Sequence, residues 1–223
     1  MNFIKKYLTK TIASQLRKPS GLLATKVANK MNQTNGFLYD FTISTMEITD
    51  NESILEIGFA NGNFFDRIFS ASNNLKLYGL DFSPEMVKEA TNNNQAAIAD
   101  GNLILKLGSS DKIPFPDNSF DKVFCINVIY FWEKPADHLK EIYRVLKPGG
   151  KFYTSIRKKE SLVQMPFSKY GFNIYTAAEW INILQLNQFN FLLTLKTENE
   201  PDTELDGTFY KMESLCIVAG KKV

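Results

Sequence analysis

The chain has 223 residues, of which 44 % are hydrophobic and 22 % are charged, and its formal net charge is +2. This length fits one domain, or one domain with a small appendage, and the composition excludes an intrinsically disordered chain. Cys125 and Cys216 both lie in apolar runs, which favours buried free thiols in a reducing compartment over a disulfide framework. The sequence contains no apolar run of membrane-spanning length and no secretory signal core, so we expect a cytoplasmic protein.

Residues 1–39 differ in charge from the rest of the chain. They contain no Asp or Glu and carry seven Lys or Arg residues, whereas residues 40–223 carry 19 basic and 24 acidic residues. Apolar residues recur here at helical spacing, which predicts helices over residues 2–17, 21–32 and 35–47. The apolar stripes consist of Ile4, Leu8, Ile12 and Leu16, and of Leu23, Val27 and Met31.

Apolar stripes of this kind need a surface to cover. We therefore predict that residues 1–47 form a helical lid over the carboxyl ends of the strands, and that residues 48–223 form the main domain. Tyr39 and Phe41 are the lid residues that we expect to touch a ligand. The alternative is a basic arm that binds nucleic acid or a membrane.

From residue 53 onward, short apolar runs alternate with helical patterns. This alternation predicts an α/β fold with a doubly wound, mostly parallel, seven-stranded sheet and helices on both faces. The predicted strands cover residues 53–59, 75–82, 103–108, 120–131, 151–156, 189–196 and 214–222. The predicted helices cover residues 61–70, 83–93, 136–146 and 176–186. The last two strands are expected to pair as a hairpin around an acidic loop at residues 197–207.

The stretch ILEIGFANGNF, residues 54–64, is a strand followed by a glycine loop. The dinucleotide fingerprint G-x-G-x-x-G corresponds here to Gly58, Ala60 and Asn63, so two of its three glycines are missing. The carboxylate of Glu56 would also repel a phosphate. A ligand without phosphate and with a positive charge fits better, and S-adenosylmethionine is such a ligand.

A second acid supports this hypothesis. Gly58 and Gly62 would let the backbone approach the methionine portion of the ligand, and Glu56 would lie near its positive centres. Asp81 ends the second predicted strand, 23 residues after Gly58. This offset is typical of an acid that accepts hydrogen bonds from ribose hydroxyls.

Four stretches of the chain resemble motifs of class I S-adenosylmethionine-dependent methyltransferases, of the methyltransferase type 11 kind related to quinone-biosynthesis enzymes. They are ILEIGFANG at 54–62, GLDFSPEMV at 79–87, IPFPDNSFD at 113–121 and RVLKPGGKF at 144–152. The resemblance covers about residues 50–155 and implies a Rossmann-like methyltransferase fold. Taken with the residue-based reasoning, it implies a cofactor site formed by Glu56, Gly58, Phe59, Ala60, Gly62, Asp81, Phe82, Met86, Ser109, Ser110, Asp111, Asn127 and Tyr39.

Two positions depart from the family pattern. Ser109 and Ser110 stand where the family often has Asp and Ala, and the usual Asp binds the adenine amino group. A serine hydroxyl can still bind adenine, and Asp111 is expected to compensate. Ala60 stands where a glycine is usual, and its methyl group would be accommodated if its φ is negative.

Aromatic side chains after the fourth and fifth predicted strands suggest an apolar or aromatic acceptor. The predicted substrate residues are Tyr130, Trp132, Phe167 and Tyr170.

His138 is predicted to lie on a helix remote from the strand ends, which argues against a catalytic role, and Asp121 is predicted to be structural. We assign no catalytic residue and no metal, and we expect small-molecule methyl transfer without nucleic acid. The alternatives are a methyltransferase acting on nucleic acid or protein, and a non-catalytic binding protein with this fold.

Overall fold

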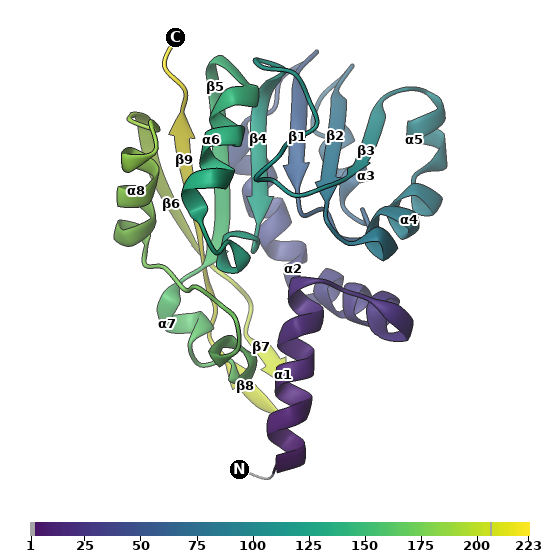
Figure 1. The fold of residues 1–223 in the computed structure, drawn as a ribbon, viewed down its shortest axis with the longest axis vertical. Coiled ribbons are helices and arrows are strands. Elements are labelled where there is room, and N and C mark those ends of the chain that lie inside the picture. The colour runs from purple at the N-terminus through teal and green to yellow at the C-terminus, as the bar shows by residue number, and fades with distance from the viewer. Residues whose placement is uncertain (1–2, 206) are drawn as a thin grey trace.

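A computed structural model describes residues 3–205 and 207–223, and its centre is a seven-stranded sheet with helices on both faces (Figure 1). The strand order is β3-β2-β1-β4-β5-β9-β6, and β9 runs antiparallel to both of its neighbours. The strands are β1 (Ser53–Ile57), β2 (Lys76–Asp81), β3 (Leu103–Leu107), β4 (Phe120–Ile126), β5 (Leu146–Arg157), β6 (Phe191–Asn199) and β9 (Glu213–Gly220). The predicted fold class and the antiparallel pairing of the last two long strands are confirmed.

The helices form two layers around this sheet, with additional turns at its carboxyl edge. They are α1 (Phe3–Arg17), α2 (Ala24–Met46), α3 (Phe65–Phe69), α4 (Pro84–Asn93), α5 (Gln95–Ala99), α6 (Pro135–Val145), α7 (Lys159–Leu162) and α8 (Ala177–Leu186). Short 3-10 turns are η1 (Gly21–Leu23), η2 (Ile129–Phe131) and η3 (Pro166–Lys169). None of the helices in the described ranges combines the length and the hydropathy that a membrane crossing needs.

The core has two parts, one on each face of the sheet. Val123 and Cys125 of β4 pack with residues of α6 and α8, while Phe124 and Ile126 pack with residues of α2 and α3. Alternate residues of this strand are therefore buried on opposite faces, which explains its almost continuous apolar sequence. Cys125 and Cys216 are both buried and free, as predicted.

Several predicted element boundaries are wrong. Residues 24–46 form one helix rather than two, because the buried Leu38 and Tyr39 pack against the sheet and override the weak propensity of the Asn-rich middle. The strand predicted over 120–131 ends at Ile126, since Asn127 has a φ of +57°. The acidic loop is also partly extended, because it contains the hairpin of β7 (Thr203–Leu205) and β8 (Thr208–Tyr210).

The N-terminal helices lie at the carboxyl edge of the sheet, below it in Figure 1. The Ser83 side chain donates a 2.7 Å hydrogen bond to the Pro19 carbonyl, and Thr25 donates a 3.0 Å bond to Glu89. Ser83 also caps α4, because its side chain accepts a hydrogen bond from the Met86 N–H. The division at residue 47 stays a proposal, because the second half of α2 belongs to the core of the sheet.

A buried ion pair between Arg157 at the end of β5 and Glu200, which follows β6, also contacts α2. The Nε and Nη2 groups of Arg157 donate to the two oxygens of the Glu200 carboxylate, at 3.1 and 2.9 Å, and the two side chains are 11 % and 2 % exposed. Arg157 also donates to Asn35 and to the Thr34 carbonyl of α2. Replacing one partner would leave the other charge buried without compensation.

We therefore expect Glu200→Gln to lower the free energy of unfolding by about 3–5 kcal/mol. Glu204→Gln is the matched control, since Glu204 is exposed on the neighbouring hairpin and should change stability by less than about 0.5 kcal/mol. Urea unfolding followed by circular dichroism measures both values. Equal stability of the two variants would contradict a structural role for the pair.

Candidate functional site

A cavity of about 460 Å³ lies outside the carboxyl ends of β1, β2 and β4, where ligands bind in open α/β sheets. This volume is in the usual range for small-molecule sites. The N-terminal segment supplies part of its wall through Leu16, Arg17, Pro19 and Met31. The remainder comes from the ends of β1, β2 and β4, from the loops that follow these strands and β3, and from the first turn of α6.

The loop after β1 packs closely against the side chain of Val128, in the loop after β4. Gly58 has a φ of +77°, and a Cβ built there would lie 2.4 Å from the Val128 side chain, so only glycine fits. Ala60 has a φ of +51°, so the condition stated for accommodating its methyl group, a negative φ, is not met. The reason is a hydrogen bond of 3.0 Å from the Ala60 N–H to Asp81, which holds the residue in the left-handed region.

Asp81 lies at the end of β2 and lines the cavity. One of its carboxylate oxygens accepts from the Ala60 N–H and the other accepts from the Ser83 N–H, at 2.8 Å. Burial raises the pKa of Asp81 to about 6, although these backbone donors and the charge of Lys18 oppose the increase. Each oxygen keeps acceptor capacity for a ligand hydroxyl.

Glu56 and Tyr39 lie next to each other outside the cavity lining. The Tyr39 hydroxyl donates a 2.5 Å hydrogen bond to the Glu56 carboxyl, and both residues are buried. Burial raises the pKa of Glu56 to about 8; the hydrogen bond from Tyr39 opposes this shift and the charge of Asp81 adds to it. The pair thus joins α2 to β1 through a hydrogen bond in the core.

The prediction that His138 is remote from the site is wrong. His138 lines the cavity, its Nδ1 lies 2.8 Å from the Ser110 hydroxyl, and its ring stacks on Trp132 with centroids 4.6 Å apart. Burial lowers the pKa of His138. The physical reason is that α6 begins at Pro135, soon after the β4 loop, so its first turn still borders the strand ends.

Asn127 carries an unsatisfied acceptor at the cavity. Its Nδ2 donates to Asn35 at 3.3 Å, while its Oδ1 is buried and has no hydrogen-bond partner among the described residues. Together with the Asp81 carboxylate, this oxygen makes the lining suitable for a ligand that brings hydroxyl groups and a cationic donor. These residues fit S-adenosylmethionine, whose ribose and ammonium groups have that character.

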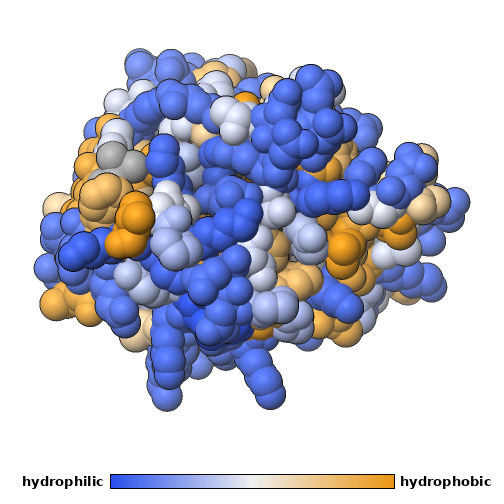
Figure 2. Space-filling view, turned by 90° about the horizontal axis from the view of Figure 1, so that it is seen from above, coloured by the Kyte–Doolittle hydropathy of each residue, from blue (hydrophilic) through white to orange (hydrophobic). Residues whose placement is uncertain are grey.

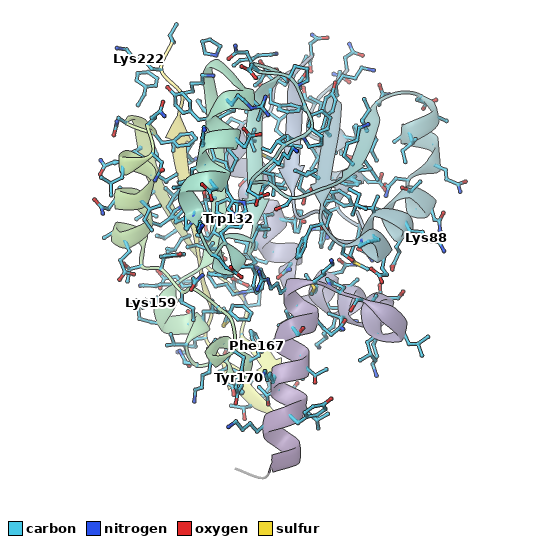
Figure 3. All side chains as sticks on the ribbon, viewed as in Figure 1. Lys88, Trp132, Lys159, Phe167, Tyr170 and Lys222 are labelled. Atoms are coloured by element: carbon cyan, nitrogen blue, oxygen red, sulfur yellow. The ribbon has the colours of Figure 1, made fainter. Side chains whose placement is uncertain are left out.

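The structure brings about half of the predicted site residues to the cavity. The residues in its lining are Gly58, Ala60, Asp81, Phe82, Ser109, Ser110, Asp111, Asn127 and Trp132. Glu56, Tyr39, Phe59, Gly62, Met86, Tyr130, Phe167 and Tyr170 lie outside it. The Tyr130 hydroxyl instead accepts a hydrogen bond from the Arg157 N–H at 2.8 Å. Phe167 and Tyr170 lie beside α1, below Trp132 in the view of Figure 3.

Sequence reasoning missed four of the charged residues at the cavity. They are Arg17, Glu133, Lys134 and Asp137. Arg17 of α1 pairs with Glu133 of the loop after β4 at 3.3 Å, and so links two walls of the site. For Arg17 the sequence did offer one indication, which is its place at the end of the first predicted helix, just before Pro19. Among the described residues, no group of three His, Cys, Asp or Glu is arranged to hold a metal ion.

Comparisons with known proteins agree with this arrangement. A family model described as "Methyltransferase domain" matches residues 55–154. The chain is similar to "Uncharacterized methyltransferase YdaC" from Bacillus subtilis, with 32 % identity over 131 residues that cover 59 % of this chain and 70 % of that protein. It is also similar to "Ubiquinone/menaquinone biosynthesis C-methyltransferase UbiE" from Rickettsia bellii, with 32 % identity over 130 residues that cover 56 % of this chain and 52 % of that protein.

A solved structure shows the same fold over most of the chain. It is the complex between the Haloferax volcanii Trm112 methyltransferase activator and a methyltransferase, which matches with a TM-score of 0.73 and 20 % identity. The match covers 90 % of this chain and 94 % of the other. Likeness at this level of identity concerns the fold and not the substrate.

The left-handed backbone of Ala60 leads to a stability prediction. Ala60→Gly should raise the free energy of unfolding by about 0.5–1 kcal/mol, because glycine avoids the left-handed penalty at the cost of some backbone entropy. Ala96→Gly is the matched control in the exposed helix α5, where the same change should destabilise by about 0.5–1 kcal/mol. Urea unfolding measures both changes in the free energy of unfolding. A gain in Ala60→Gly with a loss in Ala96→Gly supports the prediction, and a loss in both variants would contradict it.

Proposed function

The chain belongs to the class I S-adenosylmethionine-dependent methyltransferases, and we propose that it methylates a small, apolar or aromatic molecule. The observation that carries the proposal is the acceptor-rich cavity at the ends of β1, β2 and β4, with Asp81 held by two backbone N–H groups. The quinone-biosynthesis relative supports an apolar, aromatic acceptor. The aromatic rings of Phe131 and Trp132 in the lining support the same class.

We assign the cofactor contacts by chemistry. Asp81 would accept hydrogen bonds from the ribose hydroxyls, and Asn127 Oδ1 would accept one from the ammonium group. Ser109, Ser110 and Asp111 would face the adenine. Glu56 and Tyr39 would not touch the cofactor but would help to position these residues, since their hydrogen bond fixes β1 relative to α2.

When bound, S-adenosylmethionine supplies a methyl group that is already activated on a sulfonium. The chain therefore has to align the acceptor and exclude water. Leu16, Pro19 and Met31 contribute a largely apolar wall from the N-terminal segment, which suits both tasks. We assign no general base, because its need depends on the acidity of the acceptor.

A second candidate function is methyl transfer to nucleic acid or protein. It is favoured by the acid-free, basic sequence of residues 1–39, part of which borders the cavity. A nucleic acid substrate would make binding steeply dependent on salt, since phosphate contacts release counterions. Binding of an apolar small molecule would not depend steeply on salt.

The cofactor assignment is tested by binding. We expect S-adenosylhomocysteine, the demethylated product, to raise the melting temperature in a concentration-dependent way, because it binds the folded state. Asp81→Ala should weaken its binding by about 1.5–3 kcal/mol, or roughly 10- to 150-fold in Kd. Calorimetric titration measures both Kd values.

Asp100→Ala is the control for this titration, since Asp100 is an exposed acid outside the cavity lining. Its Kd should match that of the unchanged protein. Unaltered binding by a folded Asp81→Ala protein would contradict the role of Asp81. Binding of a nicotinamide dinucleotide in place of S-adenosylhomocysteine would contradict the proposed function itself.

The raised pKa of Asp81 predicts a pH dependence of cofactor binding. The carboxylate accepts two ribose hydroxyls only when ionised, and burial raises its pKa to about 6. Affinity for S-adenosylhomocysteine should therefore fall as the pH drops below about 6, by at most about tenfold per pH unit. The Asp81→Asn protein should bind S-adenosylhomocysteine weakly, and its affinity should not fall further below about pH 6. If its affinity falls with pH as steeply as that of the unchanged protein, another group causes the pH dependence.

A further inference from the structure

The segment formed by α1 and η1 exposes an unusual number of large apolar side chains. Leu8 and Ile12 of α1 are 55 % and 51 % exposed, and Leu22 and Leu23 of η1 are 104 % and 48 % exposed. Tyr7 is exposed as well. Large apolar groups gathered on one segment of a protein often mark a contact surface.

The exposed apolar residues of α1 form a stripe that leads to the cavity. Leu8, Ile12 and Leu16 are spaced four residues apart and so share one helix face. Leu8 and Ile12 are exposed, whereas Leu16 is partly buried and lines the cavity. The stripe therefore connects the outer part of α1 with the wall of the candidate site.

The charge of the same segment limits what can cover it. Lys6, Lys10 and Lys18 are exposed, and residues 1–39 contain no acid. A second copy of this segment would be repelled by like charge. A single-stranded nucleic acid would require aromatic rings for base stacking, but most of these exposed apolar side chains are aliphatic. Aliphatic side chains interleaved with lysines match an anionic lipid surface, with an apolar interior beneath negative headgroups.

The position of the segment agrees with such a surface. In Figure 1, α1 extends beyond the carboxyl edge of the sheet, away from the C-terminus of the chain. The face seen from the opposite end is mostly hydrophilic (Figure 2). Helix α1 thus lies on the carboxyl side of the sheet, which is also the side of the cavity.

We propose that α1 and η1 dock this protein onto an anionic lipid bilayer surface. Leu8, Ile12, Leu22 and Leu23 enter the interfacial region, and the lysines contact headgroup phosphates. Docking holds the cavity wall that contains Leu16 next to the membrane. Passage of an apolar acceptor from the bilayer into the cavity rests on the proposed function, whereas docking itself does not.

The test is flotation of the full chain with vesicles of phosphatidylcholine containing about 30 % phosphatidylglycerol. We expect binding to these vesicles, much weaker binding to pure phosphatidylcholine, and partial release at high salt. The double variants Leu8→Ser/Ile12→Ser and Leu22→Ser/Leu23→Ser should each bind at least about tenfold more weakly, because they remove the apolar groups that insert. Leu186→Ser is the control, since Leu186 is 77 % exposed at the end of α8.

Charge reversal provides a second comparison that does not alter apolar packing. Lys10→Glu should weaken binding to the anionic vesicles several-fold, whereas Lys222→Glu, at the opposite end of the molecule, should not (Figure 3). Circular dichroism verifies that each variant is folded. The vesicle assay contains no cofactor. Its result therefore tests membrane docking even if the proposed methyltransferase function is wrong.

Three outcomes would overturn docking. The first is absence of flotation with anionic vesicles. The second is equal loss of binding in Lys10→Glu and Lys222→Glu, or no loss in the apolar double variants. The third is tighter, steeply salt-dependent binding to a single-stranded RNA oligonucleotide than to vesicles, which would assign the segment to nucleic acid.

Discussion

The hydrogen bond between the Tyr39 hydroxyl and the Glu56 carboxyl is the contact around which the site is organised. It joins α2 to β1 in the core, and burial raises the pKa of Glu56 to about 8. Asp81 has a pKa of about 6 because backbone N–H groups oppose the effect of burial. Burial therefore favours the neutral form of Glu56 more strongly than that of Asp81, whose backbone donors stabilise the carboxylate at the end of β2.

The part of α2 near the cavity is fixed by a second set of buried contacts. Arg157 at the end of β5 bonds to Glu200 and to residues of α2, and Thr42 of α2 donates to Ser155 at 2.7 Å. Asn35 accepts from both Arg157 and Asn127. The position of Asn127 at the cavity therefore depends on α2 as well as on β4. This explains why a helix that looks like an appendage in the sequence also forms part of the core.

The sequence predicted the sheet, its strand content and the acid at the end of β2, because these follow from local apolar patterns and a fixed spacing between Gly58 and Asp81. It could not predict features that arise from contacts between distant segments. The positive φ of Ala60 depends on its hydrogen bond to Asp81, and the place of His138 depends on where α6 begins. The aromatic residues after β4 were also ambiguous, since Tyr130 is buried in packing while Trp132 lines the cavity.

The contacts around the cavity differ in strength, and this difference determines which wall can move. The ion pair between Arg17 and Glu133 joins side chains that are 44 % and 80 % exposed, so it contributes at most about 1 kcal/mol. The contact of α2 with Glu56 is buried and its contact with Arg157 is partly buried, so both cost more to break. Opening of the site should therefore separate α1 from the loop after β4, while α2 stays attached to the sheet. An acceptor would then enter beside Leu16, between α1 and Glu133.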